Sequence, residues 1–484
     1  MRFDIPDNIM FIIKELEDNG YEAYLVGGAL RDMVLNKPVH DYDIATSATP
    51  EQVMDVFKTY QVIPTGIKHG TVTVVMESDF CEVTTFRSEG KYSDSRHPDD
   101  VTFETDILKD LSRRDFTFNA IAYRPYVGKR REMPIYDEFM GENMMNILVD
   151  PYHGLDALRN GIVEVVGSSP ERFKEDPLRI MRLLRFYMQL EYRTIPIATY
   201  QAALDCMPLL KNVSPERIHD ELNKILIVFD FDAYKQNEYY EKLFQEMIKV
   251  VLPEVAHCIN FYQGNPYHCY DVMDHILCSV SKLNKHCSEP HVDLALALFF
   301  HDIGKPFTAS IGADGVVHFY GHASVSATLA EGVMMNLRYD NHTINKVKEI
   351  IRLHDTELQT STKSINRFVN KLSYVTFKEM MMIRQCDIEA QNQNHPCYKE
   401  RILKVNTLLT MYDEMEKRNC MFNLKSLAIN GNDLIALGVP QGKRIGRMLN
   451  LCLEGVIEGR LLNDKEDLID YLKPYIGGDV PSEH

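Results

Sequence analysis

The spacing of apolar residues changes along the 484-residue chain. In the first 23 residues they recur at the interval of one helix face, which predicts an amphipathic helix. The residues of this face are Ile9, Ile12, Ile13 and Leu16. Residues 72–76 and 83–86 are rich in β-branched side chains and flank a polar turn, which predicts a hairpin. From about Glu171 onward strand patterns nearly vanish and helical periodicity takes over, so the pattern predicts an α+β head and a long helical remainder.

The length of the chain exceeds what one hydrophobic core supports and predicts about three domains. Breaks that contain Gly or Pro, at residues 262–266 and 392–396, indicate domain boundaries. Residues 87–100 are polar and irregular, which predicts a mobile loop.

The composition is typical of a soluble globular protein, with 45% apolar and 25% charged residues. No apolar run approaches the roughly 18 residues of a membrane span, so we expect no membrane association. The ten cysteines are scattered without a Cys-x-x-Cys pair, which favours reduced thiols and a cytoplasmic location. The net charge of −17 argues against a protein that coats nucleic acid nonspecifically. It leaves a nucleic-acid substrate open, because phosphate contacts depend on local patches.

The first candidate site follows an apolar strand pattern at residues 24–26. The glycine pair at 27–28 predicts a tight turn that opens a helix, where backbone N–H groups can approach an anion. Arg31 lies just inside that helix and could reach the same anion. Asp41 and Asp43 are two apart in an expected strand, so both carboxylates share one face and could hold a divalent metal against a triphosphate. Each feature alone is typical of a turn or a solvated acidic pair, but together they favour metal-assisted phosphoryl chemistry.

A second candidate site contains adjacent arginines. Arg113 and Arg114 form a candidate triphosphate clamp, and Asp115 could accept hydrogen bonds from ribose hydroxyls. Asn119 offers a donor and an acceptor. Taken alone, this segment is more simply interpreted as a charged helix start capped by Asp115.

A third candidate site is a polar stripe that recurs at three-residue steps. Its members are Asp176, Arg179, Arg182 and Arg185. Pro177 after an acidic residue is typical of a helix start. The simpler interpretation is an Asp–Arg ion pair on a helix surface, worth a few tenths of a kcal/mol.

Taken together, these motifs resemble the class II tRNA nucleotidyltransferases, which are the CCA-adding enzymes and related bacterial poly(A) polymerases. The motifs stand in the order of that family: Gly-Gly, Arg-Asp and Asp-x-Asp between residues 27 and 43, Arg-Arg-Asp-Phe-Thr-x-Asn at 113–119, Asp-Pro with Gly-Leu-Asp at 150–156, and Glu-Asp-x-x-Arg at 175–179. His153 stands where the family usually has a glycine.

The resemblance implies a polymerase-β-like nucleotidyltransferase head with a mixed sheet, followed by an all-helical neck, a further helical domain and a tail. Asp41 and Asp43 would bind Mg²⁺, with Glu82 as a third carboxylate. The residues implied to bind the incoming nucleotide are Gly28, Arg31, Arg114, Asp115, Asn119, Asp176, Arg179, Arg182 and Arg185.

Within this set, the resemblance assigns base recognition to Asp176 and Arg179. Cytosine and adenine each present an amino donor beside a ring-nitrogen acceptor, which suits a carboxylate beside a guanidinium. Uracil and guanine present a carbonyl and an N–H instead, so both bonds would fail and leave polar groups unpaired. A protein template of this kind would select CTP and ATP.

A further set of His and Asp residues punctuates apolar helices between residues 268 and 387. It resembles an HD-superfamily metal-dependent phosphohydrolase, and the ligands implied are His275, His301, Asp302 and Asp387. His322 and His354 are candidate ligands of a second metal. The expected metal is Mn²⁺, Ni²⁺, Co²⁺ or Mg²⁺. The alternative is an HD fold kept only as a scaffold.

The sequence and the resemblance therefore predict a template-independent CCA-adding enzyme with tRNA, CTP and ATP as partners. They also predict a phosphatase or 2′,3′-cyclic phosphodiesterase activity of the HD domain. The expected segments are a head (1–145), a neck (146–262), an HD domain (263–392) and a tRNA-binding tail (393–484). Alternatives are a poly(A) polymerase, an enzyme that adds only A or only CC, a nucleotide-regulated HD phosphohydrolase, and a silent RNA-binding scaffold. The oligomeric state is left open.

Overall fold

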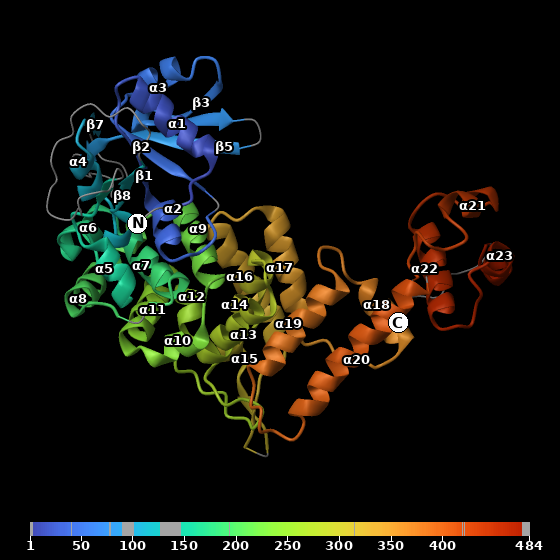
Figure 1. Cartoon of the computed structure of the whole chain (residues 1–484). Coiled ribbons are helices and arrows are strands. Elements are labelled where there is room, and N and C mark those ends of the chain that lie inside the picture. Colours follow the sequence, from blue (N-terminus) through green and yellow to red (C-terminus); the bar gives the residue numbers. More distant parts are fainter. Residues whose placement is uncertain are drawn as a thin grey trace. The chain divides into compact units, whose positions relative to one another are not determined.

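A computed structural model describes residues 3–39, 41–76, 79–89, 101–125, 147–192, 194–313, 315–418, 420 and 422–476 (Figure 1). The chain forms two compact units, Met1–Pro253 and Glu254–His484, which are taken separately below.

The N-terminal unit is built on a seven-stranded sheet of order β3-β4-β5-β2-β1-β8-β9. Its strands are β1 (Ala23–Val26), β2 (Asp43–Thr46), β3 (Gln61–Gly66), β4 (Thr71–Met76), β5 (Asp79–Thr85), β8 (Ala122–Arg124) and β9 (Ile147–Val149). β2 and β5 are parallel and the other neighbours are antiparallel, so the mixed sheet predicted from the sequence is confirmed. The predicted hairpin is β4 and β5.

The two faces of this sheet carry separate cores. Helices α1 (Asp7–Asp18) and α3 (Pro50–Val56) contribute to the first core, which includes Val72 and Val74 of β4. All four apolar residues predicted on the face of α1 are buried there. The second core joins Tyr24 and Ala45 of the sheet to α4 (Ile107–Ser112). The alternation of strand side chains between the two faces produces this division.

One predicted irregular segment is partly regular. Arg87–Glu89 forms β6, which pairs antiparallel with β7 (Val101–Phe103), so the expectation of a loop from residue 87 was wrong for its first three residues. Backbone pairing with β7 supplies the order that the polar side-chain pattern did not signal. Residues 90–100, the rest of that expected loop, lie outside the described residues.

The remainder of the unit is helical. Its elements are α2 (Gly27–Val34), η1 (Ile67–His69), η2 (Thr117–Asn119), α5 (Gly154–Asn160), α6 (Ser169–Glu175), α7 (Leu178–Gln189), α8 (Ile197–Cys206), η3 (Met207–Asn212), α9 (Pro215–Leu226), α10 (Phe231–Gln236) and α11 (Glu238–Val251). α7 is almost wholly buried and packs against α9, which brings a distant segment of the chain to the head.

The C-terminal unit is helical apart from the hairpin of β10 (Ser310–Ile311) and β11 (Val317–His318). Its helices are α12 (Pro253–Ala256), which begins at the junction, α13 (Val272–His286), α14 (Val292–Phe300), α15 (Lys305–Thr308), α16 (His322–Asn336), α17 (Asn341–Leu353), α18 (Thr362–Val369), α19 (Phe377–Glu389), α20 (Tyr398–Lys417), α21 (Gly431–Ala436), α22 (Lys443–Ile457), α23 (Lys465–Leu472) and η4 (Lys473–Tyr475). α13, α14, α16, α17 and α19 pack together, and α21 to α23 form a separate small core. The predicted fold class, a mixed-sheet head and a helical body, is thus confirmed.

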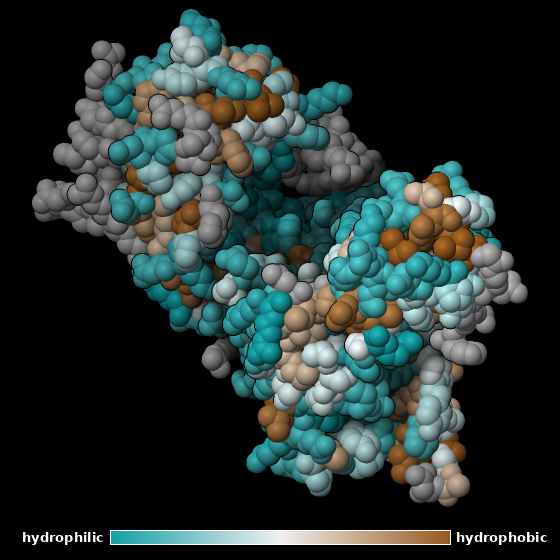
Figure 2. All heavy atoms as spheres, turned by 90° about the vertical axis from the view of Figure 1, so that its right-hand side faces the viewer, coloured by the Kyte–Doolittle hydropathy of each residue, from teal (hydrophilic) through white to brown (hydrophobic). Residues whose placement is uncertain are grey.

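The surface carries hydrophilic residues over most of the face in Figure 2, with hydrophobic residues in separate patches. In the described part of the chain, no helix combines the length and apolar character that a membrane span requires.

Candidate active site and metal cluster

A pocket of about 920 Å³ opens in the N-terminal unit where β1 passes into α2. It is lined by Asp43 and by every residue predicted to bind nucleotide: Gly28, Arg31, Arg114, Asp115, Asn119, Asp176, Arg179, Arg182 and Arg185. The structure therefore brings together three of the four motifs, with residues up to 157 positions apart along the chain, from Gly28 to Arg185.

The turn between β1 and α2 needs glycine for two reasons. Gly27 has a φ of 70°, in the left-handed region that favours glycine. A Cβ at this position would also lie 3.2 Å from Oδ2 of Asp43. The predicted tight turn is confirmed, and it brings the N-terminus of α2 beside the carboxylate.

The three predicted metal carboxylates occupy different positions at the sheet. Asp43 begins β2 and stands opposite Glu82 of β5 in the parallel register. Asp41 lies before the strand and is exposed, so the expectation that both aspartates share one strand was wrong. The pairing of β1 with β2 ends at Val26 and Asp43, so Asp41 has no partner there. Asp41 and Glu82 do not line the pocket.

The electrostatics of Asp43 fit a cation. Burial, with the nearby charges of Glu82 and Asp41, raises the pKa of Asp43 to about 6, although Arg114 opposes this shift. A partly buried carboxylate with two other acids near it would be stabilised by a divalent ion. The residues present therefore fit a metal held by Asp43 with help from Asp41 and Glu82.

The predicted arginine clamp is anchored by a buried acid. Oδ1 of Asp110 accepts a hydrogen bond from Nη2 of Arg113 at 2.7 Å, and its Oδ2 accepts one from Nη2 of Arg114 at 3.1 Å. The side chain of Asp110 is 1% exposed. These cations outweigh the effect of burial and lower the pKa of Asp110. Sequence reasoning missed Asp110, although its spacing of three and four residues from the arginines on a helix was a signal.

Asp115 organises the centre of the pocket. Its Oδ2 lies 2.6 Å from Nη2 of Arg182, and its Oδ1 accepts from the backbone N–H of Phe116 and from Asn119. Burial alone would raise its pKa, but Arg182 and the hydrogen bonds lower it to about 2. Asp115 is therefore ionised, and both oxygens are engaged within the protein. It is not the helix cap of the simpler interpretation, because Phe116 separates it from η2.

Three arginines converge on one aromatic ring. The guanidinium carbons of Arg31, Arg182 and Arg185 lie 5.3, 5.3 and 4.4 Å from the ring centroid of Phe186. Arg185 is also paired with the buried Glu221 of α9 at 3.2 Å, a contact that the sequence did not signal. The ring and the acid offset the mutual repulsion of these cations and so allow them to lie close together.

The two residues predicted to recognise the base, Asp176 and Arg179, are each held by other groups. Asp176 follows α6, and its Oδ2 accepts from Nη2 of Arg217 at 2.7 Å. Arg179 donates to Glu175 at 2.9 Å and to the backbone carbonyl of Arg113. The simpler interpretation, an ion pair between Asp176 and Arg179, is not among the ion pairs of the described residues.

The third motif lies at the start of α5. Both oxygens of Asp150 accept backbone N–H groups, from Gly154 at 2.7 Å and Leu155 at 2.9 Å, at the start of α5. A Cβ at Gly154 would lie 2.2 Å from the carbonyl oxygen of Thr117, so only glycine fits there. His153 adopts the left-handed conformation with a φ of 57°.

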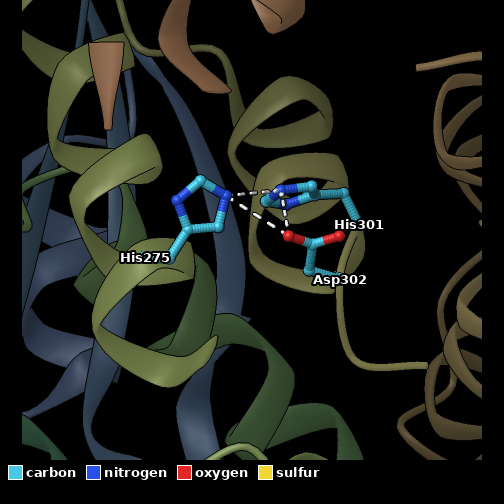
Figure 3. Close-up of side chains that lie close together, drawn as sticks. All are labelled: His275, His301 and Asp302. Atoms are coloured by element: carbon cyan, nitrogen blue, oxygen red, sulfur yellow. Dashed lines mark hydrogen bonds and ion pairs between the residues drawn. The ribbon is translucent and has the colours of Figure 1, made fainter. Parts of the chain in front are cut away.

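The C-terminal unit holds a separate cluster at a pocket of about 710 Å³. His275 of α13, with His301 and Asp302 after α14, forms a buried group with the reach of metal ligands (Figure 3). Nε2 of His275 lies 3.3 Å from Oδ2 of Asp302 and 3.0 Å from Oδ1 of Asp387. Asp387 lies inside α19, two residues before the helix ends at Glu389.

A second group shares Asp302. His322 lies 3.2 Å and His354 4.0 Å from Oδ1 of Asp302, and the three form another buried cluster. Oδ1 of Asp302 is buried and has no hydrogen-bond partner among the described residues. An orphaned carboxylate oxygen among imidazoles fits a cation.

The four histidines make the same kind of hydrogen bond to the backbone. Each Nδ1 lies within hydrogen-bond distance of a backbone carbonyl, on Ala390 for His275, Leu298 for His301, Phe319 for His322 and Ile351 for His354. A donor at Nδ1 leaves a lone pair on Nε2, which is the arrangement found for metal-binding imidazoles.

Sequence reasoning missed the cation beside this cluster. Nζ of Lys305 lies 2.6 Å from Oδ2 of Asp302 and donates to Gln263. His301 and Lys305 outweigh the effect of burial and hold the pKa of Asp302 well below its usual range. Lys305 follows Asp302 by three positions, so helical spacing was the available signal.

Three family models match the chain. "Poly A polymerase head domain" matches residues 23–164, "Probable RNA and SrmB- binding site of polymerase A" matches 194–234, and "tRNA nucleotidyltransferase domain 2 putative" matches 314–472.

Relatives and solved structures point the same way. The chain is 45% identical over 216 residues to the CCA-adding enzyme of Anoxybacillus flavithermus, covering 45% of this chain and 49% of that protein. It is 29% identical to that of Ligilactobacillus salivarius over 97% of both chains. Among the relatives with the higher identities, the match spans about half of their length.

The structure is similar to that of the Bacillus stearothermophilus CCA-adding enzyme in complex with CTP, with a TM-score of 0.63 and 26% identity over 96% of both chains. The Thermotoga maritima CCA-adding enzyme complexed with tRNA shares the fold, with a TM-score of 0.56 and 18% identity over 97% of this chain and 96% of that one. Together, these matches show that the chain is similar to CCA-adding enzymes and to poly(A) polymerases.

Proposed function

We propose that the protein is a CCA-adding tRNA nucleotidyltransferase, which adds CMP and AMP from CTP and ATP to tRNA 3′ ends without a nucleic-acid template. One observation carries the proposal. A single pocket gathers Asp43 with all nine residues that the sequence assigned to nucleotide binding. The similarity to CCA-adding enzymes over nearly the whole chain supports it.

In this mechanism the tRNA 3′ hydroxyl attacks the α-phosphate and pyrophosphate leaves. Enzymes of this class depend on a divalent metal, generally Mg²⁺, which supplies charge stabilisation for the hydroxyl and the leaving oxygens. Asp43, Asp41 and Glu82 would hold it. Arg114, Arg182 and Arg185, with the N-terminus of α2, would bind the triphosphate.

Base selection is proposed for the other side of the pocket. Asp176 would accept from the exocyclic amino group of cytosine or adenine, and Arg179 would donate to the ring nitrogen. The finer division into head, neck, HD domain and tail at residues 145, 262 and 392 stays a prediction, as does a cytoplasmic location.

The test uses tRNA that lacks its 3′ CCA, supplied with each NTP separately and with all four together. CCA addition requires two CMP and one AMP from the mixture. Addition of AMP alone, or of a long A tail, would favour the A-adding or poly(A) alternatives. Asp43→Ala and Asp41→Ala should each abolish addition, and addition near the wild-type rate in either variant would contradict the metal assignment.

A second proposed function belongs to the C-terminal unit, where we infer a metal-dependent phosphohydrolase site. The observation that favours it is the inward orientation of Nε2 in His275, His301, His322 and His354 around Asp302. The substrate class proposed is a 2′,3′-cyclic or 3′ phosphate, whose removal restores the free hydroxyl that nucleotide addition requires. The metal proposed is Mn²⁺, Ni²⁺, Co²⁺ or Mg²⁺.

The double variant His301→Ala/Asp302→Ala separates this function from the first. Elemental analysis should find metal in the wild-type protein that the variant has lost, and the variant should no longer hydrolyse 2′,3′-cyclic nucleotides. Its addition of CCA to hydroxyl-ended tRNA should be unchanged. A wild-type protein that neither retains nor uses any of these metals would favour the scaffold alternative.

A further inference from the structure

Arg217 lies beside the base-reading pair although it belongs to a distant helix. It is in the first turn of α9, and its Nη2 donates to Oδ2 of Asp176 at 2.7 Å across 41 positions of the chain. The two side chains are 22% and 16% exposed, so most of both groups is removed from water. The low local dielectric makes this pair stronger than a fully exposed one.

The other oxygen of Asp176 is held as well. Its Oδ1 accepts from the backbone N–H of Leu178 at 3.2 Å. One bond from the backbone and one from Arg217 together fix the plane of the carboxylate. Each carboxylate oxygen has about two lone-pair sites, so each can still accept one further N–H from a bound base.

Among the described residues, Asp176 is the one acid that forms an ion pair with Arg217. Nη1 of Arg217 is buried and makes no hydrogen bond within the part of the chain that the structure describes. A buried guanidinium nitrogen left unpaired costs free energy. Its bond to Asp176 therefore accounts for the position of the side chain better than the packing around it does.

We propose that Arg217 is a positioning residue for nucleotide selection. This proposal rests on the proposed nucleotide-adding function. Arg217 holds Asp176 in the rotamer that accepts an amino group and confronts the carbonyl oxygen of uracil or guanine. Without Arg217 the carboxylate can rotate toward other cations that line the pocket, such as Arg182. Rejection of UTP and GTP then weakens, because their carbonyl no longer faces an acceptor.

The test compares Arg217→Ala with the wild-type protein on tRNA lacking its 3′ CCA. We measure kcat/KM for each NTP at the position where CTP or ATP is normally added. The CTP-to-UTP and ATP-to-GTP ratios should each fall at least about tenfold, the scale of one lost or misplaced hydrogen bond to a charged group. Arg217→Lys should restore part of the ratio, because it keeps the charge without the planar fork. Lys211→Ala removes a cation from an exposed position of η3 and should leave both ratios unchanged.

A double-mutant cycle distinguishes positioning from structural support. Asp176→Ala should lower the ratios by itself, and adding Arg217→Ala should lower them no further, because both act through one carboxylate. The inference is overturned if Arg217→Ala lowers kcat/KM for all four NTPs by the same factor. It is also overturned if the double variant loses as much selectivity as the two single variants combined. If the wild-type protein adds no nucleotide at all, the proposed function fails instead, so the two failures are distinguishable.

Discussion

Asp43→Asn should stabilise the metal-free protein at neutral pH while abolishing nucleotide addition. The pKa of Asp43 is raised from 3.8 to about 6, so the folded protein disfavours the charged carboxylate. At about 1.4 kcal/mol per pKa unit, the penalty for ionisation is at most about 3 kcal/mol. The folded-state pKa is higher than the unfolded-state pKa, so protonated Asp43 contributes to the free energy of unfolding. That contribution is fully present below pH 3.8 and is lost as the pH rises through 6.

Asparagine has the shape of aspartate but does not ionise, so the variant does not lose unfolding free energy as the pH rises. Urea unfolding with EDTA, followed through the transition of the N-terminal unit, should show near-equal stability at pH 4 and an advantage of about 1–3 kcal/mol for the variant at pH 8. Mg²⁺ should reduce the difference in unfolding free energy between the variant and the wild-type protein, because it binds the Asp43 carboxylate only in the folded state. Asp18→Asn, at an exposed position on α1, is the matched control and should show no such pH dependence. A difference that is equal at pH 4 and pH 8 would refute the reasoning.

Three other substitutions test the packing and charge of the two sites. Gly154→Ala should cost more than about 2 kcal/mol in urea unfolding, because its Cβ would meet a backbone oxygen at 2.2 Å. Gly332→Ala in α16 meets no atom within 4 Å and should stabilise by about 0.5–1 kcal/mol; a loss there would contradict the geometry. Glu221→Ala leaves Arg185 without its buried partner, so the unfolding free energy should fall by roughly 3 kcal/mol. An unchanged denaturation midpoint would show that solvent replaces that acid.

Sequence reasoning succeeded where function is encoded in local motifs. The turn at Gly27, a strand at Asp43, and the helix start before Arg179 all follow from neighbouring residues, although the strand does not extend back to Asp41. It did not identify ion-pair partners that are brought together by the packing of distant helices. Glu221 and Arg217 lie on one face of α9, four residues apart. They reach the pocket residues Arg185 and Asp176 only because α9 packs against α7. No local pattern specifies that contact, so neither residue could be assigned from its own segment.

The pocket also indicates how an acidic protein could bind the triphosphate proposed as its substrate. The chain carries a net charge of −17, yet nine Arg and Lys side chains against three Asp line this pocket within the described residues. The buried acids Asp110, Asp115 and Glu221 each hold particular arginines in place rather than neutralising the whole set. An anion entering the pocket therefore meets cations whose orientation is already fixed, which reduces the entropy that binding must overcome. Overall charge and local charge thus have opposite signs, and it is the local arrangement that suits the substrate proposed.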